Sequence, residues 1–224
     1  MSDKRIEHLL IDTSGLWAAG ADFNHPDFRM LLQLSKEGDL KLFIPHIVWE
    51  ERRTQLLDKL YSKVRGLNES LEQLKSQSSG NILVQGLTAP ILTIWDKPEI
   101  EAKSKKVMAD FASDNKITIV PPGHDHAERA WERYFNIDPP FDPRITDRVK
   151  RRKDIPDSWI FEVAIDLHGK HPGLSALCDD GALADAMQSI GIRVFKDFRQ
   201  VLDEIDRSLT AEIAVKAITT QDSV

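Results

Sequence analysis

The stretch of this 224-residue chain that decides its fold is Leu9-Leu10-Ile11-Asp12-Thr13-Ser14-Gly15-Leu16. A short continuous apolar run is typical either of a strand buried on both faces or of a piece of buried helix. Here Thr13-Ser14-Gly15 interrupts the run directly after Asp12, as at the end of a strand. We therefore predict a buried parallel strand over residues 6–12 that ends on an acidic side chain.

Short apolar runs of the same kind recur along the chain, and helical patterns separate them. The other predicted strands cover residues 40–44, 117–120, 174–178 and 192–195, and the predicted helices cover 25–36, 46 to about 78, 98–112, 125–135, 156–168, 182–190 and 197–208. Asp125 and Glu128 form a capping-box-like start for one helix, and residues 136–153 are expected to be a charged loop. Strands that alternate with helices predict an α/β fold with a mostly parallel sheet between helical layers.

The chain is expected to form one domain over residues 1–208, followed by a tail over 209–224 that is partly helical or frayed. A helical arm is expected as an insertion at about 55–115, because leucines and valines from Leu57 onward alternate spacings of three and four residues. Gly66 weakens this pattern, so the arm begins with one helix that has a soft point or with two consecutive helices. We expect an antiparallel helix pair that either gives the molecule its shape or binds a partner.

Composition excludes several classes of protein. The chain is 41% hydrophobic and 29% charged, which is ordinary for a globular protein and unlike a disordered one. Its single cysteine, Cys178, excludes a disulfide framework and a cysteine-based zinc cluster. No run of 18 apolar residues predicts a membrane span, and the first residues are too charged for a secretory signal. The sequence therefore predicts a soluble, cytoplasmic protein.

The distribution of charge points to one local patch. With 30 basic and 36 acidic residues the net charge is −6, so the surface as a whole does not attract nucleic acid or anionic lipid. The candidate phosphate-binding residues gather in one segment with a single acid, Asp147, and are Arg144, Arg148, Lys150, Arg151, Arg152 and Lys153. A solvated charged loop is the alternative interpretation of this segment.

Four acids stand where an α/β sheet places a ligand site. Asp12 and Asp180 follow predicted strands, and Glu51 and Asp157 lie in the first turns of predicted helices. Ligands of open α/β sheets bind outside the carboxyl ends of the strands. Each acid alone also has a structural explanation, since acids near helix N-termini stabilise them by about 0.3–1 kcal/mol and Asp is common in turns. We nevertheless expect the four side chains to converge at one edge of the sheet.

Convergence of these carboxylates would have a chemical consequence. Two unit charges about 4 Å apart repel each other by about 4 kcal/mol at an effective dielectric constant of 20, so the cluster needs cations. Oxygen ligands favour Mg²⁺ or Mn²⁺, and metals held in this way suit phosphodiester hydrolysis. Thr13 and Ser14 are candidates for hydrogen bonds to a carboxylate or to a metal-bound water. The further candidate helpers are Asp154, Asp179 and Asp185.

The segments that carry the four acids resemble the motifs of the PIN-domain nucleases. They are residues 9–16 (LLIDTSGL), 44–51 (IPHIVWEE), 153–160 (KDIPDSWI), and 177–180 (LCDD) followed by 182–194. In addition, Tyr134-Phe135 with Pro139-Pro140-Phe141 resembles a subgroup of bacterial PIN-like proteins. The resemblance implies a three-layer α/β/α sandwich and metal-dependent cleavage of RNA. It also implies that the catalytic and metal-binding residues are Asp12, Glu51, Asp157 and Asp180.

Family members include toxins of toxin–antitoxin pairs, RNA-processing enzymes and single-strand or flap nucleases. The resemblance therefore implies a hydrolase, an endoribonuclease acting on single-stranded or structured RNA, as a toxin or defence nuclease. Its implied partners are RNA, with single-stranded DNA as a second substrate, an antitoxin or other protein, and a second copy of the chain. No membrane partner is expected.

Two other functions stay open at this point. The first is a catalytically weak PIN-like scaffold that recruits a protein partner through the arm. The second is a phosphatase of the haloacid-dehalogenase type, which residues 179–187 superficially resemble. That chemistry needs a second Asp two residues after the nucleophile, and Ser14 occupies this place after Asp12.

Two weaker motifs have structural alternatives. His124 and His126 either ligate a metal or belong to a helix start, and we favour the helix start. The tryptophans either stack on bases or pack in the core, and core packing is favoured for most of them. They are Trp17, Trp49, Trp95, Trp131 and Trp159.

Overall fold

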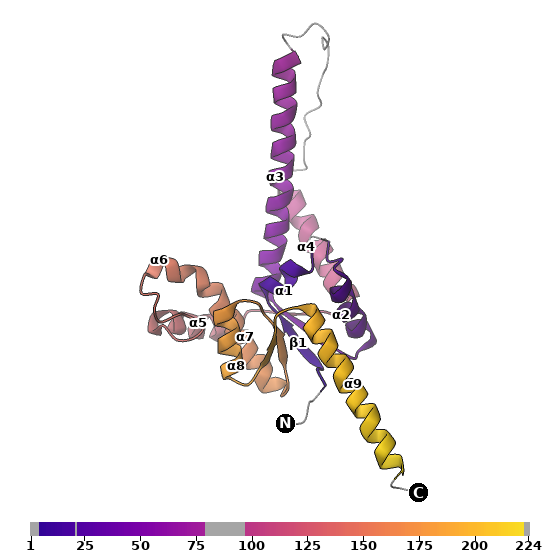
Figure 1. Cartoon of the computed structure of the whole chain (residues 1–224). Coiled ribbons are helices and arrows are strands. Elements are labelled where there is room, and N and C mark those ends of the chain that lie inside the picture. The colour runs from indigo at the N-terminus through magenta and orange to yellow at the C-terminus, as the bar shows by residue number, and fades with distance from the viewer. Residues whose placement is uncertain (1–4, 21, 79–96, 222–224) are drawn as a thin grey trace. The chain divides into compact units, whose positions relative to one another are not determined.

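The computed structural model describes residues 5–20, 22–78 and 97–221, and Figure 1 shows their elements. Trp95 and residues 79–80, where the loop after the long helix was expected, lie outside the described residues. The strands are β1 (His8–Ile11), β2 (Lys41–Pro45), β3 (Thr118–Val120), β4 (Ser175–Leu177) and β5 (Arg193–Phe195). The helices are α1 (Thr13–Ala18), α2 (Pro26–Glu37), α3 (His46–Ser78), α4 (Lys97–Asp114), α5 (His124–Asn136), α6 (Arg148–Arg151), the short 3₁₀ helix η2 (Arg152–Asp154), α7 (Ile155–Lys170), α8 (Gly181–Ser189) and α9 (Phe198–Gln221).

The five strands form one parallel sheet in the order β3-β2-β1-β4-β5. Leu10 on the central strand β1 is paired with Phe43 of β2 on one side and with Ala176 of β4 on the other. All three apolar residues that precede Asp12 are fully buried, as expected for a strand that packs on both faces. The predicted α/β class with a parallel sheet is confirmed.

Helices cover both faces of the sheet. α2 and α9 pack against each other in one layer, and α5, α7 and α8 pack together in the other (Figure 1). The predicted three-layer α/β/α sandwich is therefore confirmed. The chain leaves β1 toward β2 and β3 and later returns to β4 and β5, so the strand order reverses between β1 and β4. A reversal of this kind opens the crevice in which α/β sheets bind their ligands.

Several local predictions were wrong. Helix α1 begins directly at Thr13, where the sequence indicated only a strand end. The N-cap of α5 is Gly123 rather than Asp125, and the Gly123 N–H donates to the Nδ1 atom of His126 (3.1 Å). Part of the expected loop over 136–153 is helical, as α6 and η2. The tail after residue 208, which was expected to be partly helical or frayed, continues α9 through Gln221.

The chain divides into two compact units, residues 1–52 with 111–224, and residues 53–110. In the second unit α3 and α4 run side by side in opposite directions, and the Nη1 atom of Arg53 donates to the Oγ atom of Ser104 (3.1 Å). α3 is continuous through Gly66, so the long helix has no break there. The expected arm boundaries of about 55–115 stay a prediction.

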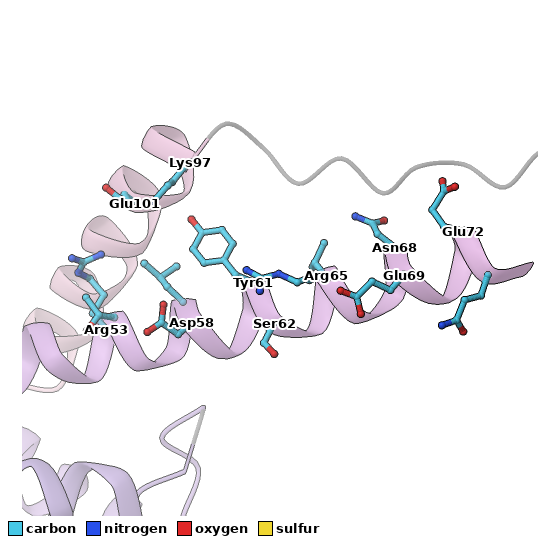
Figure 2. A pocket seen from close by; sticks show the side chains of 14 residues that line it. Arg53, Asp58, Tyr61, Ser62, Arg65, Asn68, Glu69, Glu72, Lys97 and Glu101 are labelled. Carbon is cyan, nitrogen blue, oxygen red and sulfur yellow. Dashed lines mark ion pairs between the residues drawn. The ribbon is translucent and has the colours of Figure 1, made fainter. Parts of the chain in front are cut away.

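The second unit carries a groove along α3, drawn in Figure 2. Its lining contains both acids and bases, among them Asp58, Arg65, Glu69, Glu72, Lys97 and Glu101. A mixture of both signs does not produce a field that selects polyanions. In the described part of the chain, no helix is both long and apolar enough to cross a lipid bilayer.

Candidate active site

Asp12 lies at the point where the strand order reverses. It follows β1 directly, its own N–H donates to the Leu177 carbonyl of β4 (3.1 Å), and only 3% of it is exposed. Its Oδ1 atom accepts hydrogen bonds from the Ser14 hydroxyl (2.7 Å) and from the Gly15 N–H (3.0 Å). Asp12 is thus the N-cap of α1, and this geometry fixes the position of its carboxylate.

Burial governs the ionisation of Asp12. Removal from water raises the pKa of this carboxyl group, and the nearby charge of Asp180 raises it further. Hydrogen bonds from Gly15, Cys178 and Ser14 act in the opposite direction, because they stabilise the ionised form. The net direction is upward, so the site holds this charge at a cost in free energy.

Ser14 connects the ends of the two central strands. Its hydroxyl donates to Asp12 and accepts from the backbone N–H of Asp179 (2.9 Å), which follows β4. Asp179 was predicted as a candidate helper, and its side chain is exposed in the structure. The contact that the structure provides comes instead from the Asp179 backbone.

Glu51 reaches the same region from the start of α3. Its Oε2 atom accepts a hydrogen bond from the Thr13 hydroxyl (2.8 Å), so the predicted role of Thr13 as a carboxylate partner matches this contact. The next residue, Arg52, is 1% exposed, donates to the Gly20 carbonyl (2.5 Å) and lies over the ring of Trp17 (5.1 Å to the centroid). Arg52 therefore anchors the first turns of α3 to the α1 region and holds Glu51 within reach of Thr13.

Asp180 is the N-cap of α8. Its Oδ1 atom accepts from the Leu183 N–H (3.0 Å), which leaves its second carboxylate oxygen without a role in the cap. The residue is exposed, as is Asp185 on the same helix. The structure therefore places Asp180 in an exposed position between β4 and α8.

Asp157 is the residue on which the acidic side chains converge. It lies in the first turn of α7, where Pro156 starts the helix. Its pKa is raised from 3.8 to about 7, first by burial and then by the charges of four other acids. In decreasing order of effect these are Asp180, Asp154, Asp12 and Glu51. Carboxylates as far apart in the sequence as Asp12 and Asp180 are thus close enough to Asp157 to repel its charge.

Asp154 also belongs to this acidic cluster, which we define as Asp12, Glu51, Asp154, Asp157 and Asp180. Its pKa is raised, mainly by burial, while Lys153 lowers it and Asp180 raises it. Lys153 lies 3.7 Å from its carboxylate. Among the candidate helpers, Thr13 and Ser14 donate hydrogen bonds to carboxylates of the cluster, and Asp154 is one of its members. The side chains of Asp179 and Asp185 are exposed.

The basic segment separates into exposed and buried members. Arg148, Lys150, Arg152 and Lys153 are exposed, and Arg144 is exposed but paired with Asp142 (2.9 Å). Arg151 is buried, with its guanidinium 4.9 Å from the centre of the Tyr134 ring and its Nη1 atom donating to the Ile145 carbonyl (3.4 Å). A phosphate-binding role does not fit Arg151, because its guanidinium is occupied inside the fold.

The donors of the acidic cluster are carboxylate oxygens, the ligand type that a hard divalent cation prefers. Carboxylates that raise the pKa of one of their number have an excess of negative charge, which a cation between them would neutralise. Within residues 5–20, 22–78 and 97–221, no three His, Cys, Asp or Glu side chains are arranged to hold a metal ion. Mg²⁺ keeps several waters and is commonly bound through one or two carboxylates, so a closed protein shell is not required.

Two residue types that the sequence singled out have structural roles here. Both ring nitrogens of His126 have partners inside the chain, namely the Gly123 N–H and the Asp166 carboxylate (2.7 Å), in line with the favoured helix-start interpretation. Cys178 is buried, and burial raises the pKa of its thiol, so it is not a reactive nucleophile. Arg52 was not predicted from the sequence, because a lone arginine beside a predicted acid gives no signal of burial.

Comparison with known proteins identifies one family. The family model described as PIN domain matches residues 9–175, which is well over half of the chain. The matched region includes β1 and the acids Asp12, Glu51, Asp154 and Asp157. A search of curated proteins gives no match.

Proposed function

The chain belongs to the PIN-domain family, which has a nuclease-type fold and whose members are generally hydrolases of nucleic acid, and on this premise we propose that it is a Mg²⁺- or Mn²⁺-dependent endoribonuclease. The substrate that we propose is single-stranded or structured RNA, with single-stranded DNA as the second choice. The metal-binding and catalytic residues of this proposal are Asp12, Glu51, Asp157 and Asp180.

One observation carries the proposal more than any other, and it is the electrostatic coupling of Asp157 to the other acids. A carboxyl group with a pKa of about 7 among like charges is costly in a protein of ordinary stability. Such an arrangement is typical of functional sites, where the strain serves binding or chemistry. Its place at the carboxyl ends of β1 and β4 is where an α/β sheet binds a ligand.

The residues of the chain have distinct roles in this proposal. Asp12, Glu51, Asp157 and Asp180 would hold the divalent ion, which when bound lowers the pKa of an attacking water and neutralises charge on the phosphate. Thr13 holds the Glu51 carboxylate in place by its hydrogen bond, and Ser14 does the same for Asp12.

The exposed cations before α7 supply the binding of phosphate in this proposal. Arg148, Lys150, Arg152 and Lys153 come directly before the helix that carries Asp157. Phosphates next to the one that is cut would contact these side chains, which offset the negative charge of the cluster.

The test is cleavage of a labelled single-stranded RNA by the purified protein in Mn²⁺ or Mg²⁺. We expect the parent to cut, EDTA to abolish cutting, and Mn²⁺ added in excess to restore it. Asp12→Asn should reduce the rate by more than about a hundredfold, because one oxygen ligand and its charge are lost from the cluster. Circular dichroism should show that the variant remains folded.

Asp203→Asn is the matched control, because Asp203 is a half-exposed acid on α9 that pairs with Arg199 (2.9 Å) on the same helix. This control should cut at the parental rate. If Asp12→Asn cuts as fast as Asp203→Asn, the assignment of the active site is wrong. A parent that binds RNA but does not cut in any divalent metal would favour the scaffold instead.

We further propose that the nuclease acts as a toxin or defence enzyme in the cytoplasm, held in check by an antitoxin. The support for this step is the occurrence of toxins of toxin–antitoxin pairs among PIN-domain proteins. Controlled expression of the parent should arrest bacterial growth, whereas expression of Asp12→Asn should not. Equal growth of both strains at equal protein levels would contradict a toxin role and leave the cleavage chemistry standing.

A further inference from the structure

Two aromatic side chains on α5 are exposed to solvent instead of packing in the core. Trp131 is 43% exposed and Phe135 is 68% exposed. One helical turn apart, their rings stack on each other with centroids 5.9 Å apart and planes at 27°. Two adjacent exposed rings form a contiguous apolar surface that a ligand can cover.

Buried aromatic residues hold this pair in place. The ring of Tyr134, which is buried, meets Trp131 edge-on at 5.5 Å and Phe135 at 5.4 Å, and contacts Phe141 behind it at 5.7 Å. The exposed rings therefore lie on a packed base and do not need to be ordered when a ligand binds, which lowers the entropic cost of binding.

The same tyrosine connects the aromatic pair to the cationic segment. The Tyr134 hydroxyl donates to the Arg148 carbonyl at the start of α6 (3.3 Å), and the buried guanidinium of Arg151 at its end lies over the Tyr134 ring (4.9 Å). These two contacts fix α6 beside α5 (Figure 1). Arg148 and Lys150, whose side chains are exposed, therefore belong to the short helix that these contacts attach to α5.

A continuous chain segment leads from this surface to the acidic cluster. α6 is followed directly by η2, which carries the exposed Arg152 and Lys153 and the acid Asp154, and then by α7 with Asp157 in its first turn. Along the chain, the exposed cations therefore stand between the segment that contacts Tyr134 and the acids Asp154 and Asp157.

We propose that Trp131 and Phe135 form a base-stacking platform, on which unpaired bases of a single-stranded RNA rest while Arg148 and Lys150 contact its phosphates. This inference rests on the proposed function for the choice of RNA as ligand, and it adds residues that bind bases to those that bind metal and phosphate. Aromatic rings beside cations are the combination that binds single strands, because every base has a flat apolar face and every linkage a negative charge. A duplex hides its base faces and would not use the platform.

Charge favours this occupant over a protein. In the segment from Arg144 to Lys153, four cations are exposed and not paired with Asp142, namely Arg148, Lys150, Arg152 and Lys153, although the chain as a whole has a net charge of −6. A concentration of positive charge on an otherwise acidic protein attracts a polyanion to this surface in particular. An aromatic surface built for an apolar protein face would not need these cations.

The experiment compares binding of two labelled oligomers to the full-length protein in EDTA, measured by fluorescence anisotropy. The first is a short oligo(A), and the second is an abasic oligomer with the same number of phosphates. Trp131→Leu and Phe135→Leu should each weaken oligo(A) binding by about tenfold, since stacking on one base is worth about 1–3 kcal/mol. Neither variant should change the binding of the abasic oligomer.

Conservative variants separate stacking from mere apolar contact. Trp131→Phe and Phe135→Tyr should keep most of the oligo(A) affinity, because they keep a flat ring. Met30→Ala is the matched control, since Met30 is an exposed apolar residue on α2 of the same unit, 52% exposed. It should bind both oligomers as the parent does.

The proposal is overturned if the leucine variants bind oligo(A) as tightly as the parent, or if they lose affinity for both oligomers equally. It is also overturned if they leave RNA binding intact but abolish self-association in sedimentation, since the surface would then be a protein interface. Its failure is distinguishable from that of the proposed function. A parent that cuts RNA while the leucine variants bind oligo(A) normally contradicts the platform alone, and a parent that binds through Trp131 without cutting contradicts the nuclease alone.

Discussion

Asp157 shows how the tertiary structure alters the chemistry of an ordinary side chain. Burial and the charges of Asp180, Asp154, Asp12 and Glu51 raise its pKa to about 7, so that near neutral pH the protonated and ionised forms are both populated. In the unfolded chain the same carboxyl group has its ordinary pKa of 3.8 and is ionised at neutral pH. Ionisation of Asp157 therefore costs more free energy in the folded protein than in the unfolded chain.

The pH dependence of stability follows from this difference. Between pH 4 and pH 7 the folded state binds more protons at Asp157 than the unfolded state, so the free energy of unfolding falls as the pH rises. The loss is at most about 4 kcal/mol, since one pKa unit is worth about 1.4 kcal/mol. Asp157→Asn removes this group, so in EDTA near pH 8 the variant should be more stable than the parent, and near pH 4 the two should be alike.

Urea unfolding at several pH values measures the effect, with Asp203→Asn as the control that should follow the parent throughout. A residual fall in stability with pH is expected in Asp157→Asn, because Asp12 and Asp154 also have raised pKa values. If Asp157→Asn is less stable than the parent at pH 8 in EDTA, the carboxylates are not in conflict and the cluster is misinterpreted.

The position of Asp157 depends on how α7 is held. α5 packs on α7, and the carboxylate of Glu162, which is buried in the middle of α7, accepts hydrogen bonds from Arg129 and Arg133 of α5. Asp166, one turn further along, pairs with His126 and Arg129. These ion pairs join α5 to α7 and so stabilise the position of the helix that carries Asp157.

Removal of the Glu162 carboxylate should destabilise the packing of α5 on α7. Glu162→Ala should lower the free energy of unfolding by about 3 kcal/mol, because it leaves the partly buried Arg133 without a carboxylate partner and Arg129 with Asp166 alone. Asp203→Ala, which breaks the exposed pair with Arg199, should change it by less than about 1 kcal/mol. Urea denaturation at pH 7 compares them, and equal effects would show that the Glu162 pairs have no special role in joining α5 to α7.

The distribution of charge over the molecule determines how it meets a polyanion. The chain has a net charge of −6, yet Arg148, Lys150, Arg152 and Lys153 are exposed in one segment. Association therefore has to occur in one orientation, with this segment toward the RNA and the rest of the surface repelled. Because released counterions drive such binding, its dependence on salt reports how many phosphates are contacted.

If four exposed cations each contact one phosphate of a single-stranded RNA, a plot of log affinity against log salt concentration should have a slope of about −3. Lys150→Ala should make the slope less steep by about 0.7, the amount expected for one phosphate of a single strand. Anisotropy titrations with the abasic oligomer at a series of KCl concentrations give both numbers. A slope near zero, or one that Lys150→Ala leaves unchanged, would place the phosphate contacts elsewhere on the molecule.

Much of the fold could be predicted from local patterns, because they record burial directly. The run Leu9-Leu10-Ile11 is apolar at every position, as a strand covered on both faces requires, and the alternation of such runs with helices specifies a parallel sheet. The prediction missed α1 and the helical part of 136–153 for a different reason. These short helices are held by a cap such as Asp12 and by tertiary contacts such as Arg151 with Tyr134, and their own propensity is weak.

The candidate site could likewise be predicted only in part. The amino-acid sequence by itself determined the strands, the helices and the acids that follow them, because the carboxyl ends of parallel strands always share one edge of a sheet. Only the tertiary structure decided which charges act on Asp157, that Arg151 is buried, and that Trp131 is exposed. The physical reason is that burial and electrostatic coupling depend on neighbours distant in the sequence, and no local pattern specifies them.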